Sequence, residues 1–320
     1  MAQHQITFLD QGTIPESIRW PDPEFPHTWS GWENTALEDR ISRLEETTIA
    51  VVNKVVLDRE VLAASPRLQL VQVVATGVNN VDLEACRDLG IHVCNVQGYA
   101  GNAVPEWIVA HLLGLAWQQT HYRRAQDRGD WADAEHFALR SASVREIRTM
   151  RIGILGRGTI GQGTADRLRG FGSEVLFLDR PGAETVRPGY ADFDTELSQL
   201  DALILCCPLT EDNTEMVNAD LLGRMKPGAL LLNASRGGLV NEQDLVNALR
   251  SGYLGGAALD VVSQEPIRRD NPLFAIREET NLVLTPHIAW SSEEAITTLM
   301  EVAIGNMNRF VQGQRDHCLL

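Results

Sequence analysis

Short apolar runs alternate with amphipathic and polar stretches over most of this chain. Apolar runs at residues 49–52, 70–74 and 91–94 have the length of strands, while residues 58–64 and 81–89 are predicted to be helices. Asp58 stands at the position of an N-cap, and Gly90 stands where the second of these helices would stop. This alternation of strand and helix predicts an α/β layer structure.

A second series of apolar runs follows, at residues 152–155, 175–178, 202–207, 230–232, 257–261 and 282–284. Continuous apolar runs are typical of strands that are buried on both faces of a parallel sheet. Six such strands with helices between them predict a Rossmann-type doubly wound parallel sheet.

The remaining segments set the predicted domain boundaries. The first ~45 residues, with four prolines and three tryptophans, are predicted to be irregular, as are residues 127–146. A long helix is predicted from near Pro105 to about Arg124, and a final helix over residues 292–311. We expect the final helix to return to the first domain. The predicted domains are residues 1–100 with 289–320, and residues 101–288.

Composition narrows the possible partners. The chain has 320 residues, of which 44% are hydrophobic and 22% charged, as in globular proteins. Its net charge of -15 argues against a nucleic-acid surface. No run approaches the ~20 apolar residues that cross a bilayer, and the first residues lack signal-peptide features. We expect a cytoplasmic protein with neither a membrane nor a nucleic-acid partner.

The five cysteines show no zinc-ligand spacing; they are Cys86, Cys94, Cys206, Cys207 and Cys318. Cys206 and Cys207 close an apolar run, where cysteine is expected to be a small buried side chain. The sequence therefore predicts no metal site and no disulfide framework.

A glycine-rich loop lies between the first predicted strand and helix of the second series. In this GxGxxG sequence, Gly156 would permit a tight turn, Gly158 would let a pyrophosphate approach the backbone, and Gly161 would let helix and strand pack closely. Thr159 and Ile160 would begin the helix, whose N–H groups and partial positive charge favour phosphate. The loop predicts a dinucleotide site.

An acid follows the next strand. Asp179 lies 21 residues after Gly158, close to the spacing at which a carboxylate binds the adenosine ribose hydroxyls. Because that carboxylate would repel a 2′-phosphate, NAD is predicted over NADP. Arg180 is an alternative contact for such a phosphate, or else a partner of the adenine or a solvated charge.

Three charged residues each follow an apolar run in the second half of the chain: Arg236, Glu265 and His287. Ligand sites in parallel sheets lie outside the carboxyl ends of the strands, so the three side chains are expected to meet. Arginine binds paired oxygens and stays charged, whereas histidine exchanges protons near neutral pH. We predict that Arg236 binds substrate, that His287 is the general acid and base, and that Glu265 orients its imidazole.

With these motifs the chain resembles the D-2-hydroxyacid dehydrogenases, and among them the branch of glycerate dehydrogenase and hydroxypyruvate reductase. The resemblance runs from about Trp32 to Met307. The matching motifs are residues 75–82, 95–99, 153–161, 207–210, 233–238, 258–261 and 285–289. Residues 102–107 and 147–150 depart from the family pattern, and neither stretch contains a predicted catalytic residue.

The resemblance implies NADH-dependent, reversible reduction of a small 2-oxo acid, of the hydroxypyruvate or glyoxylate type, to the D-2-hydroxy acid. It implies a smaller, discontinuous, flavodoxin-like substrate domain beside the NAD-binding Rossmann domain. It places the substrate carboxylate on the backbone of Thr76, Gly77 and Val78, as well as on Arg236. The further cofactor residues that it implies are Cys207, Pro208, Ala234 and Asp260, the last for the nicotinamide carboxamide.

Two alternative functions remain open at this point. One is a dehydrogenase for another acid, such as D-lactate or a phosphonate-bearing analogue. The other is an NAD-sensing corepressor, since such relatives keep the same three residues. The family also implies a homodimer joined through the NAD-binding domain near the long helix, where Trp107, Trp117 and Trp131 would either supply apolar contacts or pack into the helix core.

Overall fold

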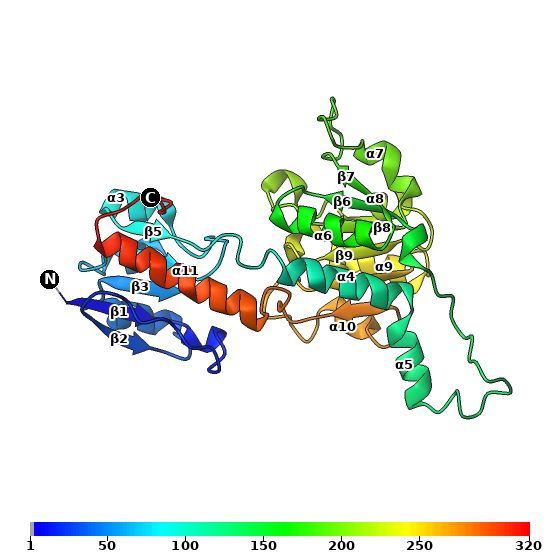
Figure 1. The fold of residues 1–320 in the computed structure, drawn as a ribbon, viewed down its shortest axis with the longest axis horizontal. Helices are drawn as coiled ribbons and strands as arrows, with labels where there is room; N and C mark the ends of the chain where they lie inside the picture. Colours follow the sequence, from blue (N-terminus) through cyan, green and yellow to red (C-terminus); the bar gives the residue numbers. More distant parts are fainter. Residues whose placement is uncertain (1–2) are drawn as a thin grey trace. The chain divides into compact units, whose positions relative to one another are not determined.

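A computed structural model describes residues 3–320, which divide into two compact units. The first unit comprises the chain up to Tyr99 together with Ser291–Leu320, and the second comprises Ala100–Trp290. Each unit has its own parallel sheet with helices beside it (Figure 1). No helix in the described part of the chain is long and apolar enough to span a bilayer.

The first unit is built on a five-stranded parallel sheet in the order β2-β1-β3-β4-β5. Its strands are β1 His4–Phe8, β2 His27–Gly31, β3 Ile49–Val52, β4 Leu70–Val73 and β5 His92–Cys94. This is the strand order of flavodoxin-like folds, so the predicted fold class of the smaller domain is confirmed.

Helices cover both faces of this sheet. The shorter ones are α1 Arg40–Leu44, α2 Arg59–Ala63 and α3 Leu83–Leu89, and the apolar side chains of all three join one core with β3, β4 and β5. Asp58 caps α2 through the N–H of Val61, as predicted, and Gly90 ends α3 in the left-handed conformation. The long helix α11, Glu293–Val311, contacts β4.

The prediction that the first 45 residues are irregular was wrong, because they contain β1 and β2. Strand β2 was missed because it is an edge strand with the sequence HTWSG, which has no buried residue and no apolar run. In β1 only the last three residues are buried, so its pattern is too short to stand out.

The second unit contains the six predicted strands, paired in parallel in the order β11-β10-β9-β8-β6-β7. They are β6 Arg151–Leu155, β7 Glu174–Leu178, β8 Ala202–Leu205, β9 Leu230–Asn233, β10 Gly256–Leu259 and β11 Leu282–Leu284. Strand β7 lies on one side of β6 and β8 lies on the other, so the strand order reverses at β6. Ligands of doubly wound sheets bind at such a reversal, at the carboxyl ends of the strands.

Alternate residues of these strands face two separate cores. One core includes α4 Ala103–Ala116 and α6 Thr159–Gly170. The other includes α7 Phe193–Glu196, α8 Ala219–Arg224, α9 Glu242–Arg250 and α10 Pro272–Ile276. Figure 1 shows α4 and α6 side by side, and the two helices are in contact. The doubly wound prediction is therefore confirmed.

The single long helix predicted up to Arg124 is instead two helices. It breaks after α4, where Gln118 takes a positive φ of 52°, and continues as α5, Gln119–Asp127. No glycine or proline marks the break, so the sequence pattern did not reveal it. Trp107 is buried in the core of this unit, whereas Trp117 is half exposed.

Candidate functional site

The turn after β6 can be built only with glycine at two positions. Gly156 has a φ of 109°, and a Cβ on it would lie 2.4 Å from the carbonyl oxygen of Cys206. A Cβ on Gly161 would lie 2.0 Å from the carbonyl oxygen of Gly156. These close approaches bring the turn, the start of α6 and the end of β8 together at the point where the strand order reverses.

The start of α6 is open toward a ligand. A Cβ on Gly158, the N-cap residue, would meet no atom within 4 Å, and no side chain caps the helix. Within residues 3–320, the N–H groups of Thr159, Ile160 and Gly161 have no acceptor. Unpaired N–H groups at a helix N-terminus are suited to phosphate oxygens. The turn therefore fits the pyrophosphate of a dinucleotide.

A hollow of about 920 Å³ adjoins this turn. Its charged lining residues are three arginines, Arg157, Arg180 and Arg187, and two acids, Glu184 and Asp212. Its volume and the excess of arginines suit a nucleotide, since ligand pockets span roughly 300–1,000 Å³. Arg180, Cys207 and Pro208, all predicted to bind the cofactor, line the hollow.

Asp179 lies at the end of β7, where its carboxylate is 1% exposed. Arg187 donates to it from Nε at 2.9 Å and from Nη2 at 2.7 Å, and the backbone N–H groups of Arg180 and Arg187 also donate to it. The guanidinium of Arg187 is the main cause of the lowered pKa of Asp179. The carboxylate thus holds the loop that carries two of the arginines of the hollow.

The two cysteines after β8 are neutral thiols. Burial raises the pKa of Cys206 to about 12 and also raises that of Cys207. The carbonyl of Cys207 accepts a hydrogen bond from Ser235 Oγ at 2.9 Å. This bond joins the cofactor side of the site to the segment that contains Ala234, which is half-buried. Both cysteines are partly buried, and Cys207 also lines the hollow.

Arg236 follows β9 on a turn that Asn233 organises. The fully buried amide of Asn233 donates to the carbonyl of Arg236 at 2.9 Å and accepts from the N–H of Ser235 at 3.0 Å. Arg236 itself is exposed, and its Nη1 donates to the carbonyl of Ser235 at 2.7 Å. In the described part of the chain it has no carboxylate partner, so its charge is available to an anion. Asn233 was not predicted as a site residue. The available signal was an amide that ends an apolar strand three residues before Arg236.

The turn after Arg236 lies against the segment that leads to Glu265. A Cβ on Gly237 would lie 1.9 Å from the carbonyl carbon of Val262 and 2.5 Å from the N–H nitrogen of Ser263. Only glycine permits this approach. The strand ends β9 and β10 are thereby brought together, as expected for neighbouring parallel strands.

His287 and Glu265 are paired. His287 Nδ1 donates to Glu265 Oε2 at 2.6 Å, and Glu265 Oε1 accepts from the N–H of Val262 at 3.2 Å. The side chains of His287 and Glu265 are 29% and 35% exposed. Among residues 3–320, no hydrogen-bond partner of His287 Nε2 is found, so this nitrogen is left to exchange a proton with a ligand.

Asp260 shapes the loop that carries His287. Its buried carboxylate accepts from the N–H groups of Ile288 at 2.9 Å and Ala289 at 2.8 Å, and from the hydroxyl of Thr285. Its carbonyl accepts from the N–H of His287 at 2.9 Å. These bonds hold His287 at a φ of 57°, a region that residues other than glycine rarely occupy. Most of the acceptor capacity of Asp260 is thus used within the loop.

The predicted carboxylate-binding loop lies in the first unit. Its shape is set by Thr76, whose hydroxyl donates to the carbonyl of Val96 at 2.9 Å, and by Asn95, whose amide donates to the carbonyl of Thr76 at 2.7 Å. In the described structure, the N–H groups of Thr76, Gly77 and Val78 donate to no other group. Three successive unpaired N–H groups can bind an anion.

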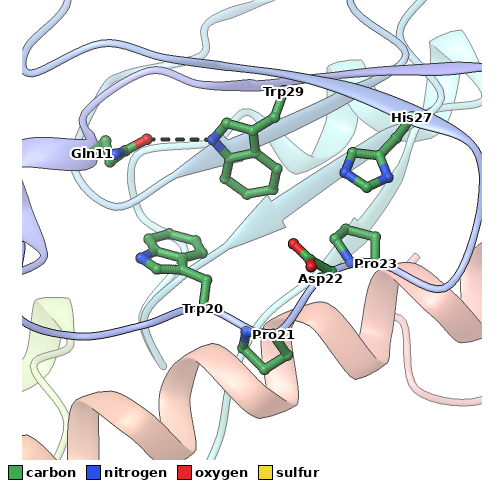
Figure 2. Close-up of a pocket in the computed structure, with 7 residues that line it drawn as sticks. All are labelled: Gln11, Trp20, Pro21, Asp22, Pro23, His27 and Trp29. Carbon is green, nitrogen blue, oxygen red and sulfur yellow. Dashed lines mark hydrogen bonds between the residues drawn. The ribbon is translucent and has the colours of Figure 1, made fainter.

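A separate hollow of about 210 Å³ lies in the first unit. Figure 2 shows the indole of Trp29 bonded to Gln11, with Trp20, Asp22 and His27 around the same space. None of the predicted site residues lines it.

Comparisons with known proteins were made at the level of sequence and of structure. The profile described as "D-isomer specific 2-hydroxyacid dehydrogenase, NAD binding domain" matches residues 109–289. A chain of Haemophilus influenzae whose name places it among 2-hydroxyacid dehydrogenases is 41% identical over 309 residues, which cover 96% of this chain and 98% of that one. The glycerate dehydrogenase of Methylorubrum extorquens is 36% identical over 311 residues, with 97% of each chain covered. Among solved structures, the TT0316 protein of Thermus thermophilus superposes with a TM-score of 0.84 at 26% identity, covering 99% of this chain and 100% of that one.

Proposed function

Because this chain belongs to the family of D-isomer specific 2-hydroxyacid dehydrogenases, we propose that it reduces a 2-oxo acid of the hydroxypyruvate or glyoxylate type to the D-2-hydroxy acid. The family membership makes it an NAD-dependent oxidoreductase. The choice of substrate follows the similarity to a glycerate dehydrogenase, since hydroxypyruvate is the oxo acid of glycerate.

Several features of the second unit fit NAD. Gly156, Gly158 and Gly161, with the N–H groups of Thr159 and Ile160, would hold the pyrophosphate, and the hollow lined by Arg180, Cys207 and Pro208 would hold the nucleoside parts. Ala234 and Asp260 would lie at the nicotinamide end. When bound, the reduced nicotinamide supplies a hydride to the carbonyl carbon of the substrate.

Substrate binding is assigned to two groups of donors. Arg236, whose guanidinium has no acidic partner in the described structure, binds the carboxylate and polarises the carbonyl oxygen. The N–H groups of Thr76, Gly77 and Val78 add further donors for the carboxylate. Both are anion-binding roles: Arg236 has no acidic partner in the described structure, and the three N–H groups have no acceptor there.

Proton transfer is assigned to His287. Its Nδ1 is held by Glu265, so Nε2 delivers a proton to the carbonyl oxygen during reduction and removes it from the hydroxyl during oxidation. The carboxylate of Glu265 accepts from Nδ1 and so fixes the orientation of the ring. Asp260 acts on the same ring through the backbone, because it holds the loop that carries it.

The observation that carries the proposal is the His287–Glu265 contact of 2.6 Å in the same unit as the unpaired Arg236. The test is a panel of 2-oxo acids assayed with NADH: hydroxypyruvate, glyoxylate, pyruvate, a phosphonate-bearing 2-oxo acid and longer branched acids. We expect the highest kcat/KM with hydroxypyruvate or glyoxylate. A higher kcat/KM with pyruvate or the phosphonate-bearing acid would assign the enzyme to another substrate. No turnover with any acid would favour the corepressor alternative.

We propose in addition a homodimer formed through the second unit, and a cytoplasmic location, where NADH is available. Trp117 and Trp131 are half exposed and Phe137 is 92% exposed, an arrangement that suits apolar contacts with a second copy. Trp107 is excluded from this role because it is buried in the core. Light scattering should give the mass of a dimer for the native chain and that of a monomer for Trp131→Ser combined with Phe137→Ser.

A further inference from the structure

Cys94 and Cys318, 224 residues apart, lie in contact in the first unit, with their sulfur atoms 2.6 Å apart. Both are free cysteines in this structure. Their separation exceeds the length of a disulfide bond, about 2.04 Å, by only about 0.6 Å. We propose that Cys94 and Cys318 form a reversible disulfide, which fastens the segment after α11 to the edge strand β5.

The contact is set by the backbone on both sides of the two cysteines. Next to Cys318, the N–H of Leu319 donates to the carbonyl of Val93 at 2.7 Å. At the next residue of the tail, the backbone oxygen of Leu320 accepts from the side-chain Nδ1 of His92 at 2.9 Å. The tail therefore runs along β5, whose other edge is paired with β4. Two bonds that involve no sulfur hold the cysteines in register.

Further contacts hold the start of this tail. His317 Nε2 donates to the carbonyl of Asn306 in α11 at 3.0 Å, and the guanidinium of Arg315 lies 4.0 Å from the ring centre of Phe310. The N–H of Cys318 donates to the carbonyl of Arg315 at 3.0 Å. The position of the Cys318 sulfur is thus defined independently of Cys94, and bond formation would need little movement.

The same place offers three potential metal ligands, Cys94, His317 and Cys318. The geometry argues against a zinc ion. Two thiolates bound tetrahedrally at about 2.3 Å from zinc are separated by about 3.8 Å, well above the 2.6 Å found between these sulfurs. His317 Nε2 is also engaged with a backbone carbonyl. Within residues 3–320 no fourth ligand joins the group.

A low-molecular-weight disulfide such as oxidised glutathione is the oxidant that we assign. The thiolate of Cys318, which is partly exposed, attacks one sulfur of glutathione disulfide, forms a mixed disulfide and releases one glutathione. The thiolate of Cys94 then attacks the sulfur of Cys318 and releases the second glutathione. The protein loses two electrons and two protons, and the oxidant gains them as two molecules of glutathione.

The burial of Cys94 affects the rate of the second step. Burial and the neighbouring Cys318 raise the pKa of Cys94, so little of its thiolate is present at neutral pH. The ring closure should therefore accelerate as the pH rises. An excess of reduced glutathione runs both steps backward and returns the two thiols.

The test uses the full-length protein in glutathione buffers of stepped potential, followed by acid quenching, alkylation and peptide mass spectrometry. We expect one cross-linked peptide pair that contains Cys94 and Cys318, with a mass about 2 Da below that of the reduced pair. We also expect oxidation to raise the thermal midpoint of the native chain by about 5–10 °C. The readouts do not depend on turnover, so they stand apart from the proposed function.

Three variants complete the experiment. In Cys318→Ser and Cys94→Ser, oxidation should leave the thermal midpoint unchanged, whereas Cys86→Ala, which removes a buried cysteine of the same unit, should still give the cross-link. The proposal would be overturned if both Cys94 and Cys318 were still alkylated after incubation in oxidised glutathione alone. The binding of one zinc ion per reduced chain that is lost in Cys318→Ser would also overturn it, since the group would then be a metal site.

Discussion

His287 Nδ1 donates to Glu265 Oε2 at 2.6 Å, and the two residues are held by different segments of the second unit. Glu265 is fixed to the N–H of Val262, and His287 to the carbonyl of Asp260. The imidazole is thereby oriented from one side, while Nε2 has no hydrogen-bond partner among residues 3–320. This arrangement leads to the first two predictions.

His287→Ala should lower kcat for 2-oxo acid reduction by roughly 10²- to 10⁴-fold, the usual contribution of a positioned acid or base. The dissociation constant of NADH should change little, because the glycine turn and the hollow do not involve His287. Stopped-flow kinetics and a fluorescence titration with NADH measure the two quantities. Turnover near that of the native enzyme would remove His287 from the mechanism.

Glu265→Gln should lower kcat less than His287→Ala does, while the dissociation constant of NADH stays nearly constant. The variant removes the carboxylate that accepts from His287 Nδ1, so the imidazole loses its fixed orientation although its Nε2 remains. Steady-state kinetics measure kcat, and Glu301→Gln, at an exposed position in α11, should leave it unchanged. A kcat for Glu265→Gln equal to that of the native enzyme would contradict this role.

Arg236→Gln should raise KM for the oxo acid and lower kcat, while KM for NADH stays nearly constant. Hydrogen bonds to a charged group contribute about 1.5–3 kcal/mol, equivalent to roughly 10- to 150-fold in kcat/KM. Arg236→Lys should recover only part of this loss, because an ammonium lacks the paired donors of a guanidinium. Arg269→Gln, which alters an exposed arginine of the same unit, is the matched control.

Asp179→Ala should narrow the preference for NADH over NADPH. It removes a carboxylate that would repel a 2′-phosphate, and it releases Arg187 beside Arg180 in the hollow. The ratio of kcat/KM for the two cofactors measures the change, with the exposed Asp316→Ala as control. An unchanged ratio would show that Asp179 only holds the loop of Arg187 and does not affect the choice of cofactor.

The same carboxylate gives a prediction about stability and pH. The pKa of Asp179 is lowered in the folded chain, so its stabilising effect is fully present above its ordinary pKa of about 3.9 and is lost as pH falls toward the folded value. Urea unfolding should therefore separate the native chain from Asp179→Ala at pH 7 and bring the two together as the pH falls below about 4. An equal difference at all pH values would contradict this assignment.

Two glycine substitutions should separate stability from NADH binding. Gly237→Ala should destabilise the chain by about 1–3 kcal/mol or more, because its Cβ would overlap the carbonyl of Val262. Gly158→Ala should leave stability unchanged or raise it by up to about 1 kcal/mol, because its φ of -80° suits alanine and the space around it is open. Gly158→Ala should nevertheless raise KM for NADH roughly tenfold, since the methyl group would occupy the space assigned to the pyrophosphate. Normal NADH binding in this variant would place the pyrophosphate elsewhere.

Much of the fold could be predicted because its strands are buried on both faces. All six strands of the second unit are apolar runs, and such runs are visible without knowledge of their neighbours. Strand β2 could not be predicted in this way, since it is stabilised by pairing with β1 rather than by its own apolar side chains. The break at Gln118, where φ is positive, likewise has no glycine or proline to mark it in the sequence.

The candidate site also has features that the sequence predicts and features that it does not. Arg236, Glu265 and His287 could be proposed from their places after strands, because parallel strand ends share one edge. The bonds that hold them could not, since Asn233 and Asp260 act on backbone groups whose positions depend on the folded turns. The ion pair between Asp179 and Arg187 and the contact of Cys94 with Cys318 also could not be predicted, because they depend on the three-dimensional structure.

Asp260 also ties the last residues of the second unit to the loop that carries His287. Its carboxylate fixes Ile288 and Ala289, and the second unit ends at Trp290, whose indole donates to the carbonyl of His287. The last three residues of the second unit are thus tied back to the loop that carries His287. Because the imidazole and the glycine turn belong to one compact unit, the packing of that unit alone sets the spacing between them.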